Sequence, residues 1–167
     1  MVPGSDSAPS DRVPTAADER FMRLALEEAR LAGAEDEVPI GTVIACGDEL
    51  LAREHNRVRA RCDPSAHAEI LALRAAARVL AVVRLTECVV YSTVEPCFMC
   101  AGALVHARVR RAVWAVRDPK FGGCVSLGRL LELPGANHRV PWSEGVLADE
   151  ARALLQEFFR ARRGRGP

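Results

Sequence analysis

Two short segments dominate the sequence: His-Ala-Glu at residues 67–69 and Pro-Cys-Phe-Met-Cys at residues 96–100. Together they supply one imidazole, two thiols and one carboxylate. Zinc takes nitrogen and sulfur ligands in a tetrahedron, and a catalytic zinc site leaves the fourth position open to water. We therefore expect His67, Cys97 and Cys100 to bind one zinc ion per chain, while the carboxylate of the first segment stays free for proton transfer.

Local signals predict that both segments stand at the start of a helix. Residues three apart are neighbours on a helix, so two cysteines at this spacing can bind one ion from a first turn. Pro96 suits the first helical position, and the Asp-Pro-Ser at residues 63–65 predicts a second helix start. The partial positive charge at a helix N-terminus favours thiolate over thiol. We expect helices over residues 66–80 and 97–107 to converge on the metal, with Glu69 as the acid–base group.

Length and charge limit the classes of protein that the chain can be. The 167 residues are enough for one domain with a core, and the formal net charge is only +1. This balance argues against a bulk polyanion binder, so we expect no DNA partner. No apolar run approaches membrane-spanning length, so we expect no membrane partner. We predict a disordered leader over residues 1–14, the folded domain over residues 15–163 and a tail over residues 164–167.

Cysteine usage predicts a reduced, cytoplasmic protein. The chain has six cysteines, and two of them are assigned to the metal motif. Cys46 and Cys88 lie in apolar, strand-like runs, where buried free thiols are expected. A disulfide framework is therefore not predicted.

Hydrophobic patterning predicts alternating helices and strands, and hence an α/β fold with three α/β/α layers around a mixed five-stranded sheet. The outer strand should be the last, since Pro141 cannot donate to a ladder on both sides. We expect loops over residues 57–61 and 117–126. The remaining expected elements are a capped helix from Thr15, strands over residues 38–46, 50–55, 85–94, 111–116 and 138–143, and a last helix with apolar positions from Leu147 to Phe158.

The two motifs, in this order, match the H-x-E and P-C-x-x-C signature of zinc nucleobase deaminases. Further segments make the chain resemble the bacterial tRNA-specific adenosine deaminases from about Phe21 to Arg163. The segments that carry this resemblance are Glu37-Val38-Pro39-Ile40-Gly41, His55-Asn56-Arg57, residues 63–70 and 95–103, Arg117-Asp118-Pro119-Lys120, Gly135-Ala136-Asn137-His138, Gly145-Val146-Leu147-Ala148-Asp149-Glu150, Phe158-Phe159-Arg160 and Arg162-Arg163.

The resemblance implies a cytidine-deaminase-like fold, a homodimer and conversion of adenosine to inosine at the wobble position of a tRNA anticodon. It assigns zinc to His67, Cys97 and Cys100, and proton transfer to Glu69. By the same resemblance, the residues that would contact the flipped base or the anticodon stem-loop are Asn56, Ala68, Asp118, Lys120, Phe158 and Arg162.

Two positions depart from the family pattern, and two other functions remain open. Cys62 stands where a His or a polar residue is expected, and Cys124-Val125 replaces small residues, which puts the shape of the loop in question. A small-molecule deaminase acting on guanine or cytosine would use the same zinc chemistry. A deaminase-like subunit that binds RNA without catalysis is a third hypothesis, which the presence of Glu69 disfavours.

Overall fold

A computed structural model describes residues 14–163. The predicted leader lies outside the described residues except for Pro14, and the predicted tail lies wholly outside them. Within the described range, none of the helices has the length and apolar character needed to cross a membrane. In chain order the elements are α1 (Ala16–Ala34), β1 (Gly41–Cys46), β2 (Glu49–His55), α2 (Val58–Arg61), α3 (Ala68–Leu80), β3 (Cys88–Val94), α4 (Phe98–Ala107), β4 (Arg111–Val116), the 3-10 helix η1 (Leu130–Glu132), β5 (Trp142–Glu144) and α5 (Ala148–Arg163).

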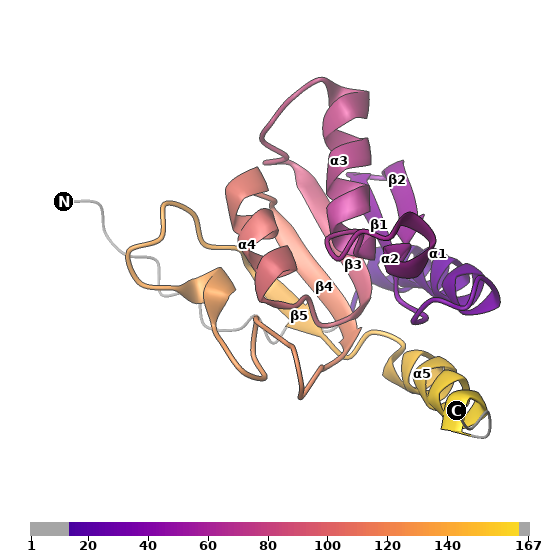
Figure 1. Cartoon of the computed structure of the whole chain (residues 1–167). Coiled ribbons are helices and arrows are strands. Elements are labelled where there is room, and N and C mark those ends of the chain that lie inside the picture. Colours follow the sequence, from indigo (N-terminus) through magenta and orange to yellow (C-terminus); the bar gives the residue numbers. More distant parts are fainter. Residues whose placement is uncertain (1–13, 164–167) are drawn as a thin grey trace.

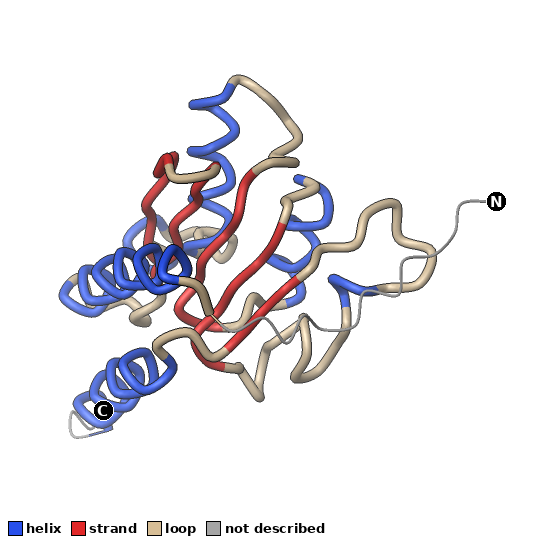
Figure 2. The backbone as a smooth tube through the Cα atoms, turned by 180° about the vertical axis from the view of Figure 1, so that it is seen from behind, coloured by secondary structure: helices blue, strands red, loops and turns tan. Residues whose placement is uncertain are grey.

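The strands form one mixed sheet in the order β2-β1-β3-β4-β5. β1 is antiparallel to both neighbours, whereas β3, β4 and β5 are parallel. Four strands therefore run in one direction, and their carboxyl ends meet at one edge of the sheet. Helices α3 and α4 cover one face, and α1 with α5 lies on the other (Figures 1 and 2). The predicted three-layer α/β architecture with five strands is confirmed.

Alternation along the central strands divides the core between the two faces, because successive side chains of a strand point to opposite sides. On β4, Ala112 and Trp114 pack with α3 and α4, whereas Val113 and Ala115 pack with α1 and α5. Both sides of this strand are buried. The sheet is thus a rigid layer whose edge can hold a site.

The two metal helices begin one to two residues later than predicted, which changes where the ligands stand. His67 and Cys97 are the N-cap residues of α3 and α4, with extended backbone angles, instead of lying inside the helices. Pro96 accordingly precedes the cap and does not occupy the first helical turn. At a cap the side chain projects from the helix end, so both ligands can meet in the space between the two helix starts.

Other departures from the predicted elements have identifiable physical causes. The predicted loop over residues 57–61 contains the short helix α2, because the carboxylate of Glu37 accepts the N–H groups of Arg59 and Ala60 at the start of its turn. The last strand is shorter than predicted: it begins after Pro141 and pairs with β4 at the outer edge. The strands β1 and β3 also start three residues later than predicted, since turns precede both.

Candidate metal centre and active site

The three predicted ligands come together at the sheet edge. His67 stands at the start of α3, Cys97 caps α4, and Cys100 lies in the first turn of α4. The Nδ1 atom of His67 lies 3.6 Å from the sulfur of Cys97 and 3.6 Å from the sulfur of Cys100. All three donor atoms lie within 4.8 Å of one another. The two helix starts converge as the sequence predicts.

This donor set fits a tetrahedral metal ion. Zinc–nitrogen bonds of about 2.0–2.1 Å and zinc–sulfur bonds of about 2.3 Å at tetrahedral angles put a ligand nitrogen and a ligand sulfur about 3.6 Å apart. The two nitrogen–sulfur distances match that value. The His67, Cys97 and Cys100 side chains could therefore hold a metal ion with one position left for a further ligand.

Electrostatics favour the metal-binding thiolate form at Cys97, one of the two cysteines. The hydrogen bond from Cys100 lowers the pKa of Cys97 to about 4, with a further contribution from His67. The same hydrogen bond and burial raise the pKa of Cys100. The hydrogen bond to Cys97 also raises the pKa of His67. The thiolate, which is the form that binds metals, is thus favoured at Cys97 and disfavoured at Cys100.

Glu69 lies beside the ligands without belonging to the donor group. It is the second residue of α3 and is only 4% exposed. The thiol of Cys100 donates to Oε2 over 3.6 Å, and the hydroxyl of Ser92 lies 3.5 Å from Oε1. Burial raises the pKa of the Glu69 carboxyl. A carboxyl with a raised pKa can both accept and return a proton at neutral pH, which suits a general acid–base group.

Asn56 and Ala68 are held together by a hydrogen bond. The N–H of Ala68 donates to the side-chain oxygen of Asn56 over 2.9 Å, and Asn56 is 6% exposed. The backbone of Asn56 is fixed by its N–H, which donates to the carbonyl of Ile40 over 3.1 Å. This arrangement places Asn56 directly against the start of α3, one residue from His67. The Ala68 N–H, predicted to face a base, is here the donor that orients Asn56.

Glu95 organises the loop over residues 117–126, a role that sequence reasoning missed. Glu95 is 2% exposed and stands two residues before Cys97. The carboxylate accepts the hydroxyl of Ser126, and it also accepts the backbone N–H groups of Asp118, Cys124, Val125 and Ser126. A buried carboxylate between an apolar strand and a proline was the available signal, because a buried charge needs such partners.

The loop over residues 117–126 packs closely on the start of α4. This packing shows how Cys124, one of the two departures from the family pattern, is accommodated. A Cβ atom at Gly122 would lie 2.4 Å from the Glu95 carboxylate, and one at Gly123 would lie 2.7 Å from the backbone of Phe98. Cys124 fits because its side chain is fully buried and its thiol points to the carbonyl of Pro96, 3.6 Å away. Cys62, the other departure, is exposed and ends α2 in a left-handed conformation.

We expect Glu95→Gln to lower the free energy of unfolding by about 2–3 kcal/mol at pH 7, because a charged acceptor of several buried N–H groups is lost. Burial alone would raise the pKa of Glu95, but the hydrogen bonds from Ser126, Val125 and Asp118 outweigh it and lower the pKa below 4.5. Because the pKa is lowered in the folded state, the ionised carboxylate stabilises the fold fully when the pH is above the ordinary pKa of a glutamate. This stabilisation is lost as the pH falls through the folded-state pKa.

Urea unfolding of wild type and variant at pH 7 and in steps below pH 4.5 measures this effect. The difference should be full at pH 7 and should shrink in acid. Glu87→Gln, at an exposed position, serves as the control and should leave the unfolding midpoint unchanged. A Glu95→Gln variant as stable as wild type at pH 7 would show that the loop does not depend on this carboxylate.

The remaining predicted contact residues lie at two places. Asp118 shapes its own loop, since its carboxylate accepts the N–H groups of Lys120 and Phe121, and Lys120 is exposed. Phe158 and Arg162 lie on the last turns of α5, with the Arg162 guanidinium 4.6 Å above the Phe158 ring. Arg162 also donates to the backbone oxygen and the carboxylate of Asp36 over 2.9 and 2.8 Å. Thus Arg162 is held against the α1–β1 connection.

Comparison with known proteins finds close relatives over nearly the whole described chain. Residues 16–163 match the MafB19-like deaminase family. A tRNA-specific adenosine deaminase of Aquifex aeolicus is 43% identical over 142 residues, which is 85% of this chain and 93% of that protein. The tRNA-specific adenosine deaminase of Agrobacterium fabrum is 43% identical over 143 residues, covering 86% of this chain and 94% of the relative.

Two solved structures are similar to this chain at different levels of sequence identity. A structure from work on A-to-I editing by tRNA:A34 deaminases at the wobble position is 42% identical, with a TM-score of 0.79 over 81% of this chain and 99% of that chain. A guanine deaminase from Nitrosomonas europaea is 30% identical, with a TM-score of 0.75 over 90% of this chain and 88% of the other. The deaminase that edits tRNA is therefore nearer in sequence than the one named for guanine.

Proposed function

The chain belongs to the tRNA-specific adenosine deaminases within the MafB19-like deaminase family, and we propose that it converts adenosine to inosine at the wobble position of tRNA anticodons. One observation carries the chemistry: a buried carboxylate, Glu69, stands beside a His–Cys–Cys group with tetrahedral ligand spacing. The choice of substrate rests on the relatives of about 40% identity. The reaction replaces the amino group of adenine with oxygen from water and releases ammonia.

We propose zinc as the metal, one ion per chain, held by His67 Nδ1 and the thiolates of Cys97 and Cys100. When bound, zinc supplies a Lewis acid that lowers the pKa of a coordinated water. Glu69 accepts a proton from the attacking water and delivers it to N1 of adenine. The same carboxylate then takes the remaining proton of the added hydroxyl group and passes it to the amino group, so that the C6–N bond breaks, ammonia leaves and the added oxygen becomes the carbonyl of inosine. The burial of Glu69 supports this role, because it favours the protonated form that must donate.

We propose that Asn56 and the loop around Asp118 receive the target nucleotide. With its oxygen engaged by Ala68, the Asn56 side chain offers its NH2 group to an acceptor on the base. The Ala68 N–H then contributes by holding this amide in place. Asp118 and Lys120 lie on the loop that Glu95 holds against the start of α4. RNA contacts made by this loop would therefore have a fixed position relative to the metal ligands on α4. Single-stranded loops whose bases can be splayed out are the usual targets of sequence-specific RNA recognition.

We expect a variant with Arg162→Gln and Arg163→Gln to bind an anticodon stem-loop more weakly. Each lost phosphate contact should lower the slope of log affinity against log salt by about 0.7 for a single strand. Single-turnover deamination of bound RNA should change little. Affinity measured across a salt series, with single-turnover rates beside it, tests this prediction.

The ion pair of Arg162 with Asp36 provides the matched control. Asp36→Asn removes the negative charge that pairs with Arg162 but leaves the Arg162 charge and its hydrogen bond to the backbone oxygen of residue 36, so it should not weaken RNA binding as the arginine variant does. If Asp36→Asn weakens binding equally, Arg162 acts by holding α5 in place. If the arginine variant keeps the wild-type affinity and slope, this part of α5 does not bind RNA.

We propose a cytoplasmic homodimer, as the resemblance implies. Phe98 and Met99, at the start of α4, are 46% and 41% exposed although both are large and apolar. Gly102 and Ala103 follow on the same helix, and small residues permit close packing against another helix. Light scattering of the purified protein should give twice the chain mass of 18.1 kDa, and a monomer at micromolar concentration would refute the dimer.

Deamination of free guanine is the second candidate, because a guanine deaminase structure is 30% identical with a TM-score of 0.75. The metal chemistry would be the same, so only substrate choice separates the two functions. Parallel assays with an anticodon stem-loop, free guanine, free cytosine and free adenosine make the distinction. We expect turnover of the stem-loop alone.

A further inference from the structure

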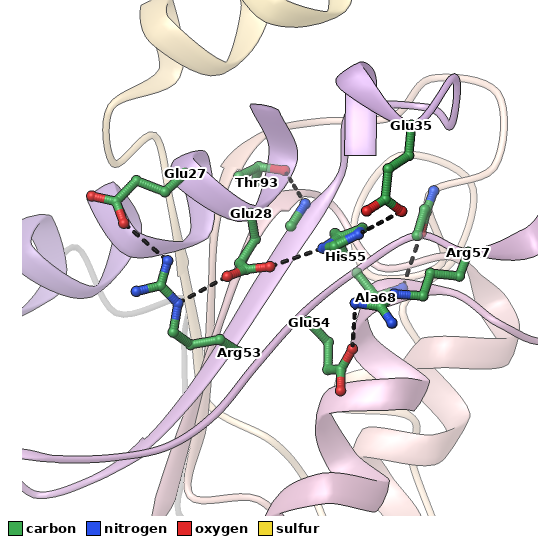
Figure 3. A network of polar contacts seen from close by, with 11 residues as sticks. Glu27, Glu28, Glu35, Arg53, Glu54, His55, Arg57, Ala68 and Thr93 are labelled. Carbon is green, nitrogen blue, oxygen red and sulfur yellow. Dashed lines mark hydrogen bonds and ion pairs between the residues drawn. The ribbon is translucent and has the colours of Figure 1, made fainter. Parts of the chain in front are cut away.

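A buried histidine at the end of β2 makes polar contacts that the proposed chemistry does not use. His55 is the last residue of β2, and its side chain is only 3% exposed. Its Nδ1 lies 2.9 Å from a carboxylate oxygen of Glu28, and its Nε2 lies 3.2 Å from one of Glu35. Figure 3 shows the ring lying between these two carboxylates. Glu28 lies in α1 and Glu35 is the C-cap of α1, so these contacts hold the end of α1 against the end of β2.

This arrangement fixes the ring on both sides. Only the doubly protonated imidazolium can donate to both carboxylates at once. The second oxygen of Glu28 accepts Nε of Arg53 over 2.9 Å, and Arg53 in turn donates to Glu27 over 2.9 Å (Figure 3). Burial alone would raise the pKa of Glu28, but the hydrogen bonds from His55 and Arg53 lower it overall. A buried ion pair is weak evidence of stabilisation. We therefore ask which neighbouring residue His55 holds in place.

The residue after His55 is Asn56, which holds the start of α3. Ala68 is the first residue of that helix, so its N–H has no acceptor within the helix. Its acceptor is the side-chain oxygen of Asn56, 2.9 Å away. His67 immediately precedes Ala68. A continuous set of contacts therefore leads from Glu28 and Glu35, through His55 and Asn56, to the helix start that carries a proposed metal ligand.

We propose that His55 is a positioning residue that sets Asn56 against Ala68 and so orients the Asn56 amide toward the base. The part of this inference that concerns the base rests on the proposed function. The placement of Asn56 itself does not, and it can be measured without substrate.

Hydrogen exchange of the Ala68 amide, followed by NMR in the full-length protein, measures that placement. His55→Gln removes the ring, and Glu35→Gln replaces the charged outer acceptor of the ring with a neutral amide, at a residue whose side chain is half-exposed. Both should speed exchange at Ala68, by about tenfold for His55→Gln, the size expected from loss of one to two hydrogen bonds. The Ala101 amide in α4, which donates to the Cys97 carbonyl, serves as the internal control and should keep its rate.

Arg20→Gln is the matched control variant, because it breaks an exposed ion pair with Asp48, which lies at the opposite end of β2 from His55. It should leave Ala68 exchange at the wild-type rate. Unchanged exchange at Ala68 in folded His55→Gln and Glu35→Gln would overturn the proposal. If His55→Gln fails to fold, the Glu35→Gln measurement decides alone.

A double-mutant cycle with Asn56→Ala then tests whether His55 acts through Asn56. Alone, His55→Gln should lower kcat/KM on the stem-loop, by up to about 100-fold if the contact group is misplaced by an ångström. In the Asn56→Ala background the same change should have little further effect. Equal losses in both backgrounds would mean a general structural role. Absence of activity in wild type would refute the proposed function and leave the exchange result standing.

Discussion

Glu69→Gln should retain the fold and the metal but lose deaminase turnover by about 10²–10⁴-fold, the usual contribution of a positioned acid–base group. Gln has nearly the volume of Glu, which matters because the side chain is almost fully buried. Its amide oxygen can accept one of the two hydrogen bonds that Cys100 and Ser92 make to the carboxylate, and its NH2 group can donate to the other partner. It cannot take a proton from water and return it to the base. The expected loss is therefore in kcat, with metal content unchanged.

Three measurements on one preparation test this expectation: single-turnover rate, metal per chain and the circular dichroism spectrum. Glu87→Gln, at an exposed position, makes the same chemical change away from the site and should have wild-type activity. Glu69→Ala should behave like Glu69→Gln. Near-normal turnover in either variant would assign proton transfer to another group.

Cys97→Ala and Cys100→Ala should each lose bound zinc, and activity with it. With either change only two donors remain, and three protein ligands are the usual number in a catalytic zinc site. Both sulfurs lie 3.6 Å from His67 Nδ1, and among residues 14–163 no fourth His, Cys, Asp or Glu belongs to this donor group. Elemental analysis after dialysis gives the number of zinc ions per chain.

Cys62→Ala is the matched control, since Cys62 is an exposed free thiol outside the donor group. It should keep one zinc per chain and wild-type turnover. Prolonged treatment of wild type with a chelator should reproduce the activity loss of the cysteine variants, and added zinc should restore it. Full zinc content in both site variants would refute the ligand assignment.

Local patterns were sufficient to predict the architecture and the donor group. The capping box at Thr15 and Asp18 is present, and the strand over residues 111–116 has the predicted bounds. The spacing of the two cysteines placed both in one helical start. These features depend on residues within a few positions of each other, which is why the sequence alone reveals them.

Contacts between distant segments could not be predicted in this way. The partners of Glu95 come from a loop more than 20 residues away, and those of His55 from a helix 20 to 27 residues before it. The engagement of Arg162 by Asp36 spans 126 residues. The exact helix starts also escaped prediction, because whether His67 and Cys97 are caps depends on backbone angles that the tertiary contacts set.

The position of inosine in a tRNA transcript is the decisive measurement for adenosine deamination at the wobble position. A tRNA with adenosine at the wobble position would be incubated with the zinc-loaded protein, beside transcripts that carry the adenosine elsewhere in the anticodon loop. Sequencing and nucleoside mass spectrometry would locate and quantify the product. We expect inosine at the wobble position alone, and none with Glu69→Gln. Absence of inosine in the tRNA, together with release of ammonia from free guanine, would contradict it.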